Sequence, residues 1–192
     1  MKPGTRALGV AESYRDDRST LAGCVVRADR VVDGVALGSC TVGGTDATAA
    51  VLDLFDRLGR ADIQYLLVAG IAPAWFNILD LHRLHDGTGL PALSVSFEHS
   101  NGLAGGVRDA FTGEDRTRRL ETYRAQPPRR PVEVGAETVF VRGVGIDDER
   151  AERVVRAFTP EGGRPEPVKV ARLAARGGDE FRRLSNSAAS KD

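Results

Sequence analysis

Three acidic residues stand where their carboxylates could share one divalent cation. Glu12 follows the first strand-like segment, Asp46 opens the first long helical pattern, and Asp80 lies in a predicted helix after an apolar run. Clustered carboxylates repel one another unless a cation such as Mg²⁺ or Mn²⁺ neutralises them, and such sites serve phosphodiester hydrolysis. The three acids are therefore candidate catalytic residues, with Glu12 and Asp46 as candidate metal ligands. The alternative is that Asp46 stabilises a helix dipole and Asp80 is solvated.

Histidines offer a second set of candidate ligands. His82 and His85 stand three residues apart on one predicted helix, where they could join Asp80 in a metal site. The alternative for both is a partly exposed helix flank. His99 follows the last central strand in the sequence FEHSNG, and there a loop histidine is the simplest interpretation.

Aromatic and basic side chains make a candidate nucleic-acid surface. Trp75 and Asn77 open a predicted helix behind a proline, and Arg118 and Arg119 lie in the arginine-rich stretch 116–130. An aromatic ring can stack on a base, and arginines can contact phosphates. The alternatives are that Trp75 belongs to the core and that the arginines form a solvated face.

Length and composition limit the architecture. The chain has 192 residues, 41% of them hydrophobic, with a formal net charge of zero. The length and hydrophobic content predict one domain over 1–184 and a disordered tail over 185–192. The balanced charge predicts no overall electrostatic attraction to nucleic acid or membrane. The apolar runs fall short of the ~20 residues that span a bilayer, and no signal peptide precedes the first acid, so we expect a cytoplasmic protein. Cys24 and Cys40 are expected to be buried and reduced.

Periodicity predicts an α/β fold with a ribonuclease-H-like mixed sheet. Three antiparallel strands come first, then two parallel αβ units, with helices on both faces. These elements are strands at 6–11, 21–27 and 31–42, a helix through 49–59 capped by Thr45, a strand at 64–68, a helix at 73–85 and a strand at 92–97. Further on we expect a helix and an exposed Pro-rich connection within 116–130, a strand at 137–143, a helix at 147–158 capped by Asp147, and a short terminal helix at 165–175.

Several stretches together resemble an uncharacterised, mostly archaeal family, domain-of-unknown-function family ninety-nine, which is related to endonuclease V. The matching stretches are LGVAES, LAGCVVRADRVVDGV, GGTDATAAV, LLVAGIAPAWFNILDL, TGLPALSV and GRPEPVKVARLAA. The resemblance implies a ribonuclease-H-like fold. It also implies metal-dependent nicking of DNA or RNA near deaminated bases.

The chain departs from this family at chemically important positions. Ala11 and Glu12 stand where the resemblance implies a pair of aspartates, and Ala69 stands where it implies a metal-binding aspartate. Phe97 and Glu98 stand where endonuclease V places a lysine. Loss of one such group costs about 3 kcal/mol or more of transition-state stabilisation.

We therefore expect an endonuclease-V-like protein with impaired metal-dependent chemistry that binds nucleic acid or a nucleotide. One alternative is an active metal-dependent endonuclease on deaminated DNA or RNA. Another is a non-catalytic scaffold.

Overall fold

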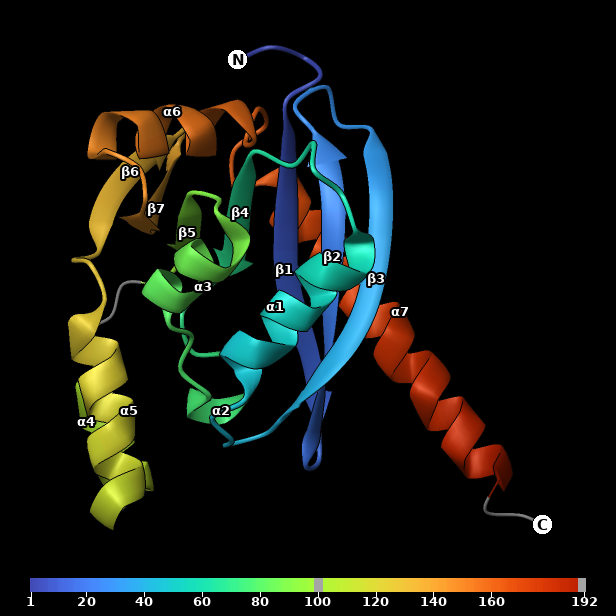
Figure 1. The fold of residues 1–192 in the computed structure, drawn as a ribbon, viewed down its shortest axis with the longest axis vertical. Coiled ribbons are helices and arrows are strands. Elements are labelled where there is room, and N and C mark those ends of the chain that lie inside the picture. The colour runs from blue at the N-terminus through green and yellow to red at the C-terminus, as the bar shows by residue number, and fades with distance from the viewer. Residues whose placement is uncertain (99–101, 190–192) are drawn as a thin grey trace.

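The computed structural model describes residues 1–98 and 102–189. Within these residues, seven strands form one mixed sheet in the order β3-β2-β1-β4-β5-β7-β6 (Figure 1). The strands are β1 (Arg6–Arg15), β2 (Arg18–Arg27), β3 (Val32–Thr41), β4 (Tyr65–Ala69), β5 (Ala92–Ser96), β6 (Arg130–Val134) and β7 (Glu137–Val144). β1, β2 and β3 pair antiparallel, whereas β4 is parallel to both β1 and β5. The predicted order of three antiparallel strands and two parallel units is confirmed.

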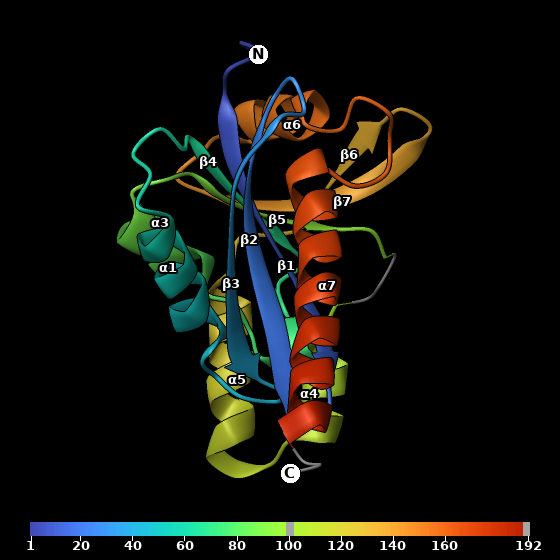
Figure 2. The ribbon, with the colours of Figure 1, turned by 90° about the vertical axis from the view of Figure 1, so that its right-hand side faces the viewer.

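Helices cover both faces of the sheet, as predicted. They are α1 (Ala47–Leu58), α2 (Pro73–Phe76), α3 (Leu81–Thr88), α4 (Ala104–Ala110), α5 (Gly113–Ala125), α6 (Asp148–Ala157) and α7 (Glu166–Ala189). Figure 2 shows α1 and α3 on one side of the sheet and α7 on the other. Strand residues alternate accordingly, because successive side chains point to opposite faces. Leu8 and Val10 pack in the core under α1, whereas Ala7 and Ala11 lie in the cores on the other face.

The predicted helix over 73–85 is wrong. The chain makes one distorted turn, α2, and a separate helix, α3, because Ala74, Trp75 and Phe76 have φ values of 47°, 53° and 61°. A left-handed conformation costs a non-glycine residue roughly 1–2 kcal/mol. Tertiary hydrogen bonds hold this turn, since the carbonyl oxygen of Ala74 accepts from the backbone of Gly43. The local sequence carries no signal for such a contact.

The end of the sheet beyond β5 also differs from expectation. The predicted exposed connection after α5 leads directly into β6, which pairs antiparallel with β7. β7 in turn pairs antiparallel with β5. Pro131 lies in β6, and an edge strand tolerates proline because one side of it makes no ladder hydrogen bonds.

Helix α7 is longer than predicted. It runs for 24 residues, through Ala189, instead of ending near 175. Ion pairs of Asp179 with Arg182 and of Glu180 with Arg183 support its second half. The hydroxyl of Ser185 bonds back to the carbonyl oxygen of Phe181, so the helix continues into the expected tail, of which 190–192 lie outside the described residues. None of the helices within the described ranges is long and apolar enough to cross a bilayer.

Candidate functional site

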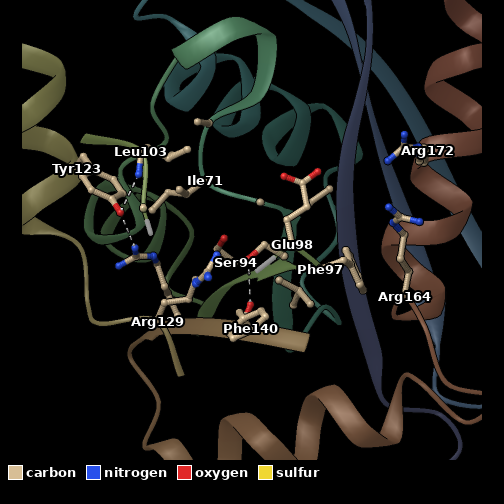
Figure 3. A pocket seen from close by; sticks show the side chains of 17 residues that line it. Ile71, Ser94, Phe97, Glu98, Leu103, Tyr123, Arg129, Phe140, Arg164 and Arg172 are labelled. Atoms are coloured by element: carbon tan, nitrogen blue, oxygen red, sulfur yellow. Dashed lines mark hydrogen bonds between the residues drawn. The ribbon is translucent and has the colours of Figure 1, made fainter. Parts of the chain in front are cut away.

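A cleft opens at the carboxyl ends of the parallel strands β4 and β5. Its cavity measures about 270 Å³ and is lined by Ala69 and Gly70 from the end of β4 and by Ser94 and the residues after it from β5. In open α/β sheets, ligands commonly bind at this edge. Figure 3 shows Ser94, Phe97 and Glu98 between two walls that come from distant parts of the chain. The parallel unit that the sequence predicts therefore builds the floor of the site.

The first wall combines aromatic rings with arginines. The Arg129 guanidinium lies 4.2 Å from the ring centre of Phe140, and that of Arg142 lies 5.3 Å from the ring centre of Tyr123. The Tyr123 hydroxyl accepts hydrogen bonds from Arg142 at 3.3 Å and from the backbone of Leu103 at 3.2 Å. Burial lowers the pKa of Arg142, Tyr123 opposes this, and the charge of Arg129 lowers the pKa further. Two cations are thus held close together on this side.

The second wall contains three more arginines, Arg164, Arg172 and Arg176, which we call the arginine triad. Arg164 precedes α7 and lies 4.5 Å from the ring centre of Phe97 (Figure 3). Arg172 lines the cleft, and with Arg176 it also lines an adjoining hollow beside Ala69. Burial lowers the pKa of Arg164, and repulsion from Arg172 and Arg176 lowers it further, against the attraction of Glu137 and Glu98. The triad members therefore act on one another electrostatically.

The acids predicted to bind a metal do not gather in this cleft. Both carboxylate oxygens of Asp46 accept hydrogen bonds from Thr41 at 2.9–3.1 Å, and one accepts from Asn77 at 2.7 Å. Burial raises the pKa of Asp46, but these hydrogen bonds prevail and hold it below its ordinary value. Asp46, rather than the predicted Thr45, is the residue that begins α1. Asp80 begins α3, where its carboxylate accepts from the backbone of His82 and Arg83.

Glu12 is the predicted acid that lies nearest the cleft, because it lines the hollow beside Ala69. Its carboxylate accepts a hydrogen bond from the hydroxyl of Ser19. Side chains alternate between the two faces along β1, so Glu12 lies on the same face as Leu8 and Val10, whose side chains face α1. Two arginines of the second wall, Arg172 and Arg176, instead lie on α7, on the opposite face of the sheet (Figure 2).

These residues do not fit a divalent metal. The Ala69 side chain offers no ligand atom at the end of β4, the Asp46 carboxylate is hydrogen-bonded by Thr41 and Asn77, and the Asp80 carboxylate caps α3. Within residues 1–98 and 102–189, no three His, Cys, Asp or Glu side chains are grouped to hold an ion. His82 and His85 instead lie 3.1 Å and 2.7 Å from backbone carbonyl oxygens, whereas His99 lies outside the described residues.

Two of the residues predicted to bind nucleic acid are buried. Asn77 has no exposed surface; its amide oxygen accepts from Ala47 and its amide nitrogen donates to Thr41 and Asp46. Arg119 is only 3% exposed. These two side chains are therefore used to hold the fold together, which the sequence could not reveal.

Arg119 joins the helix pair α4–α5 to the rest of the molecule. Its guanidinium donates to the carbonyl oxygens of Phe76 at 3.2 Å and Gly44 at 3.1 Å, and also to that of Gly43. It lies 3.8 Å from the ring centre of Phe111. Trp75 packs on the same ring, with centres 5.1 Å apart, yet keeps 49% of its surface exposed. Trp75 and the exposed Arg118 thus keep the access to solvent that a nucleic-acid contact requires.

The sequence alone does not predict that the arginines of the two walls come together, because they lie in four separate segments of the chain. One signal is visible. Arg172 and Arg176 stand four residues apart, on the flank of a helix whose buried face carries Val168, Ala171 and Ala175. Residues at this spacing share a helix face, so two cations there that form no ion pair with any described residue are the signal of an anion site.

Comparison with known proteins establishes the family. A family model described as "Endonuclease dU" matches residues 3–178. The chain belongs to the endonuclease dU family. Relatives include UPF0215 proteins of Methanopyrus kandleri, 33% identical over 184 residues with 92% of each chain covered, and of Thermococcus kodakarensis, 31% identical with 91% of this chain and 92% of the relative covered. The archaeal family predicted from the sequence is therefore confirmed.

Solved structures place the endonuclease dU family in the same fold class as endonuclease V. A protein of unknown function from Archaeoglobus fulgidus has a TM-score of 0.80 at 24% identity, covering 90% of this chain and 97% of that one. Human ENDOV has a TM-score of 0.61 at 17% identity, covering 94% and 86%. Ciona intestinalis endonuclease V, solved with a DNA 24mer containing inosine, has a TM-score of 0.60 at 13% identity, covering 94% and 87%. At these identities the likeness confirms the fold.

Proposed function

We propose that this member of the endonuclease dU family binds nucleic acid in the cleft between the two arginine walls and does not cleave it by a metal-dependent route. One observation carries the proposal. The end of β4 presents Ala69, and the cleft and the hollow beside it are lined by five arginines but only two carboxylates, Glu12 and Glu98. Arginines attract a phosphate backbone but repel a divalent cation, so this arrangement favours binding over hydrolysis.

The composition of the cleft suits a nucleic acid. Guanidinium groups contact phosphates, and aromatic rings such as those of Phe97, Phe140 and Tyr123 can stack on bases. A structural neighbour, the Ciona endonuclease V, was solved with DNA, which supports the same class of partner here. The family description names dU, so strands containing deoxyuridine are the first ligands to test. A cytoplasmic location, as the sequence predicts, is part of this proposal.

Trp75 and Arg118 are the proposed contacts with nucleic acid outside the cleft. Both are exposed, and Trp75 projects from the turn that follows the β4 end of the cleft. In this proposal, the two side chains contact the nucleotides of a bound strand that flank those in the cleft. The proposed binding does not use Mg²⁺ or Mn²⁺, because the described part of the chain groups no three His, Cys, Asp or Glu side chains that could hold either ion.

Fluorescence anisotropy with labelled single- and double-stranded oligonucleotides tests the proposal. The strands should contain deoxyuridine, inosine or ordinary bases, and each should be measured in EDTA and in Mn²⁺. We expect binding that weakens steeply with salt, is equal in EDTA and Mn²⁺, and leaves the strands intact. The change Arg142→Met should weaken binding, whereas Arg116→Met, at an exposed position on α5, serves as the matched control. Absence of binding at low salt would refute the proposal and favour the scaffold.

A second candidate function is metal-dependent cleavage at deaminated bases. The family description and the position of Glu12 beside Ala69 favour it. Gel analysis of the same strands after incubation with Mn²⁺ decides between the two. Cleavage that disappears in Glu12→Ala would establish the nuclease and overturn the binding-only function.

A further inference from the structure

Arg172 and Arg176 of the arginine triad differ from the other charged side chains of α7, which form ion pairs. Arg164, which precedes α7, is attracted by Glu137 and Glu98. Lys169 pairs with Glu166 at 2.5 Å, Arg182 pairs with Asp179 at 3.1 Å, and Arg183 pairs with Glu180. In the part of the chain that the structure describes, Arg172 and Arg176 form no ion pair. The pairing along α7 is thus interrupted where the helix passes the end of β4.

The position of the triad makes it a receptor for a compact anion. Arg172 borders both the cleft and the hollow, and Arg176 borders the hollow together with Ala11 and Ala69. Ala11 and Ala69 contribute only short side chains to this hollow, and the Glu12 carboxylate that also lines it already accepts a hydrogen bond from the hydroxyl of Ser19. Burial lowers the pKa of Arg164, the charges of Arg172 and Arg176 lower it further, and a bound anion relieves the repulsion among these three groups.

The geometry points to a site for the terminal phosphate of a nucleotide, held by Arg164, Arg172 and Arg176 without a metal, with the attached base in the adjoining cavity. This inference rests on the proposed function and adds the chemical class of the ligand. A phosphomonoester carries about −1.5 to −2 charges at pH 7 and three acceptor oxygens, whereas an internal phosphodiester carries a single charge. Three guanidinium groups therefore favour a strand end or a free nucleotide over the middle of a strand.

The cavity limits what accompanies the phosphate. Its volume of about 270 Å³ lies near the lower end of the range for small-molecule sites, which suits one base. Phe97 and Phe140 both line this space, with the Arg164 and Arg129 guanidinium groups 4.5 Å and 4.2 Å from their ring centres (Figure 3). The tethered base and the phosphate thus occupy neighbouring parts of one site.

Competition binding in EDTA tests the inference. The probes are one single-stranded deoxyuridine oligonucleotide with a 5′-phosphate, a 3′-phosphate or hydroxyl ends, together with deoxyuridine monophosphate and deoxyuridine. We expect a terminal phosphate to tighten strand binding by about tenfold or more, and the monophosphate to compete where the nucleoside does not. The double variant Arg172→Met with Arg176→Met should remove this advantage, so that the phosphate-ended strand loses about tenfold more affinity than the hydroxyl-ended strand and the two then bind alike.

Arg183→Met is the matched control, because it lies on the same helix in an ion pair and should keep the phosphate advantage. Equal affinity for phosphate- and hydroxyl-ended strands would overturn the inference while leaving the proposed function intact. An equal loss for all strands in the double variant would also overturn it, because the arginines would then act as general attraction. If the monophosphate binds in a triad-dependent manner and no strand binds, the inference stands and the proposed function fails.

Discussion

Replacing Arg119 by methionine removes a buried guanidinium while keeping most of the length of the side chain. Three carbonyl oxygens outside its own helix lose their donor, those of Gly43, Gly44 and Phe76. A hydrogen bond from a charged donor contributes about 1.5–3 kcal/mol, so the three together set an upper limit of roughly 4.5–9 kcal/mol. Water will reach some of these carbonyl groups after the change. We therefore expect a loss of about 3–5 kcal/mol in the free energy of unfolding, the range typical of breaking a buried charged group's contacts.

Urea unfolding measured by circular dichroism and by fluorescence checks this value. The chain contains one tryptophan, Trp75, which lies 5.1 Å from Phe111 and reports on the same corner. The neighbouring change Arg118→Met is the control, because its exposed side chain should alter stability by less than about 0.5 kcal/mol. If Arg119→Met unfolds within about 1 kcal/mol of the unchanged protein, the assignment of Arg119 as the link between α4–α5 and the sheet is wrong.

Three further changes test other parts of the structure. In Gly9→Ala the new methyl group would lie 2.1 Å from the backbone of Pro167, so thermal unfolding should show a loss of about 3 kcal/mol or more, whereas Gly4→Ala meets nothing within 4 Å and should be neutral. The pKa of Asp46 is lowered in the folded state, so its stabilising effect is present above its unfolded pKa and is lost on acidification. The stability difference between the unchanged protein and Asp46→Asn should therefore shrink from about pH 5 to about pH 2 in a series of urea titrations, and a constant difference would contradict this. Replacing Arg172 and Arg176 by methionine relieves repulsion within the triad and should raise the unfolding temperature in low salt, with a smaller rise in high salt; a lowered temperature would show that the two cations stabilise the fold.

The sequence predicts those elements whose pattern is local. The apolar run ending at Ala69 forms β4, and Asp147 begins α6 with its side chain accepting from Arg150, as expected. By contrast, the residues around Trp75 have an ordinary helical composition. Their left-handed conformation depends on contacts with Gly43 and Arg119, which are distant in the sequence.

The candidate site likewise has one part that the local sequence predicts and another that depends on contacts between distant segments. The position of Ala69 could be predicted because it ends a recognisable strand, whereas the arginine walls form only when the loop before β6, β7 and the segment from Arg164 into α7 meet. Asn77 and Arg119 were predicted to face nucleic acid because their type suits it, but their hydrogen bonds lie inside the molecule. Residue type alone does not distinguish a buried hydrogen-bonding group from a surface contact.

The arginines around Ala69 limit what a carboxylate at this position could do. An aspartate introduced at position 69 would face Arg172 across the hollow, and we expect the two to form an ion pair. A carboxylate paired with a guanidinium is less available to a cation, so this one substitution does not by itself create a metal ligand. Construction of a metal site here would also require changes in α7.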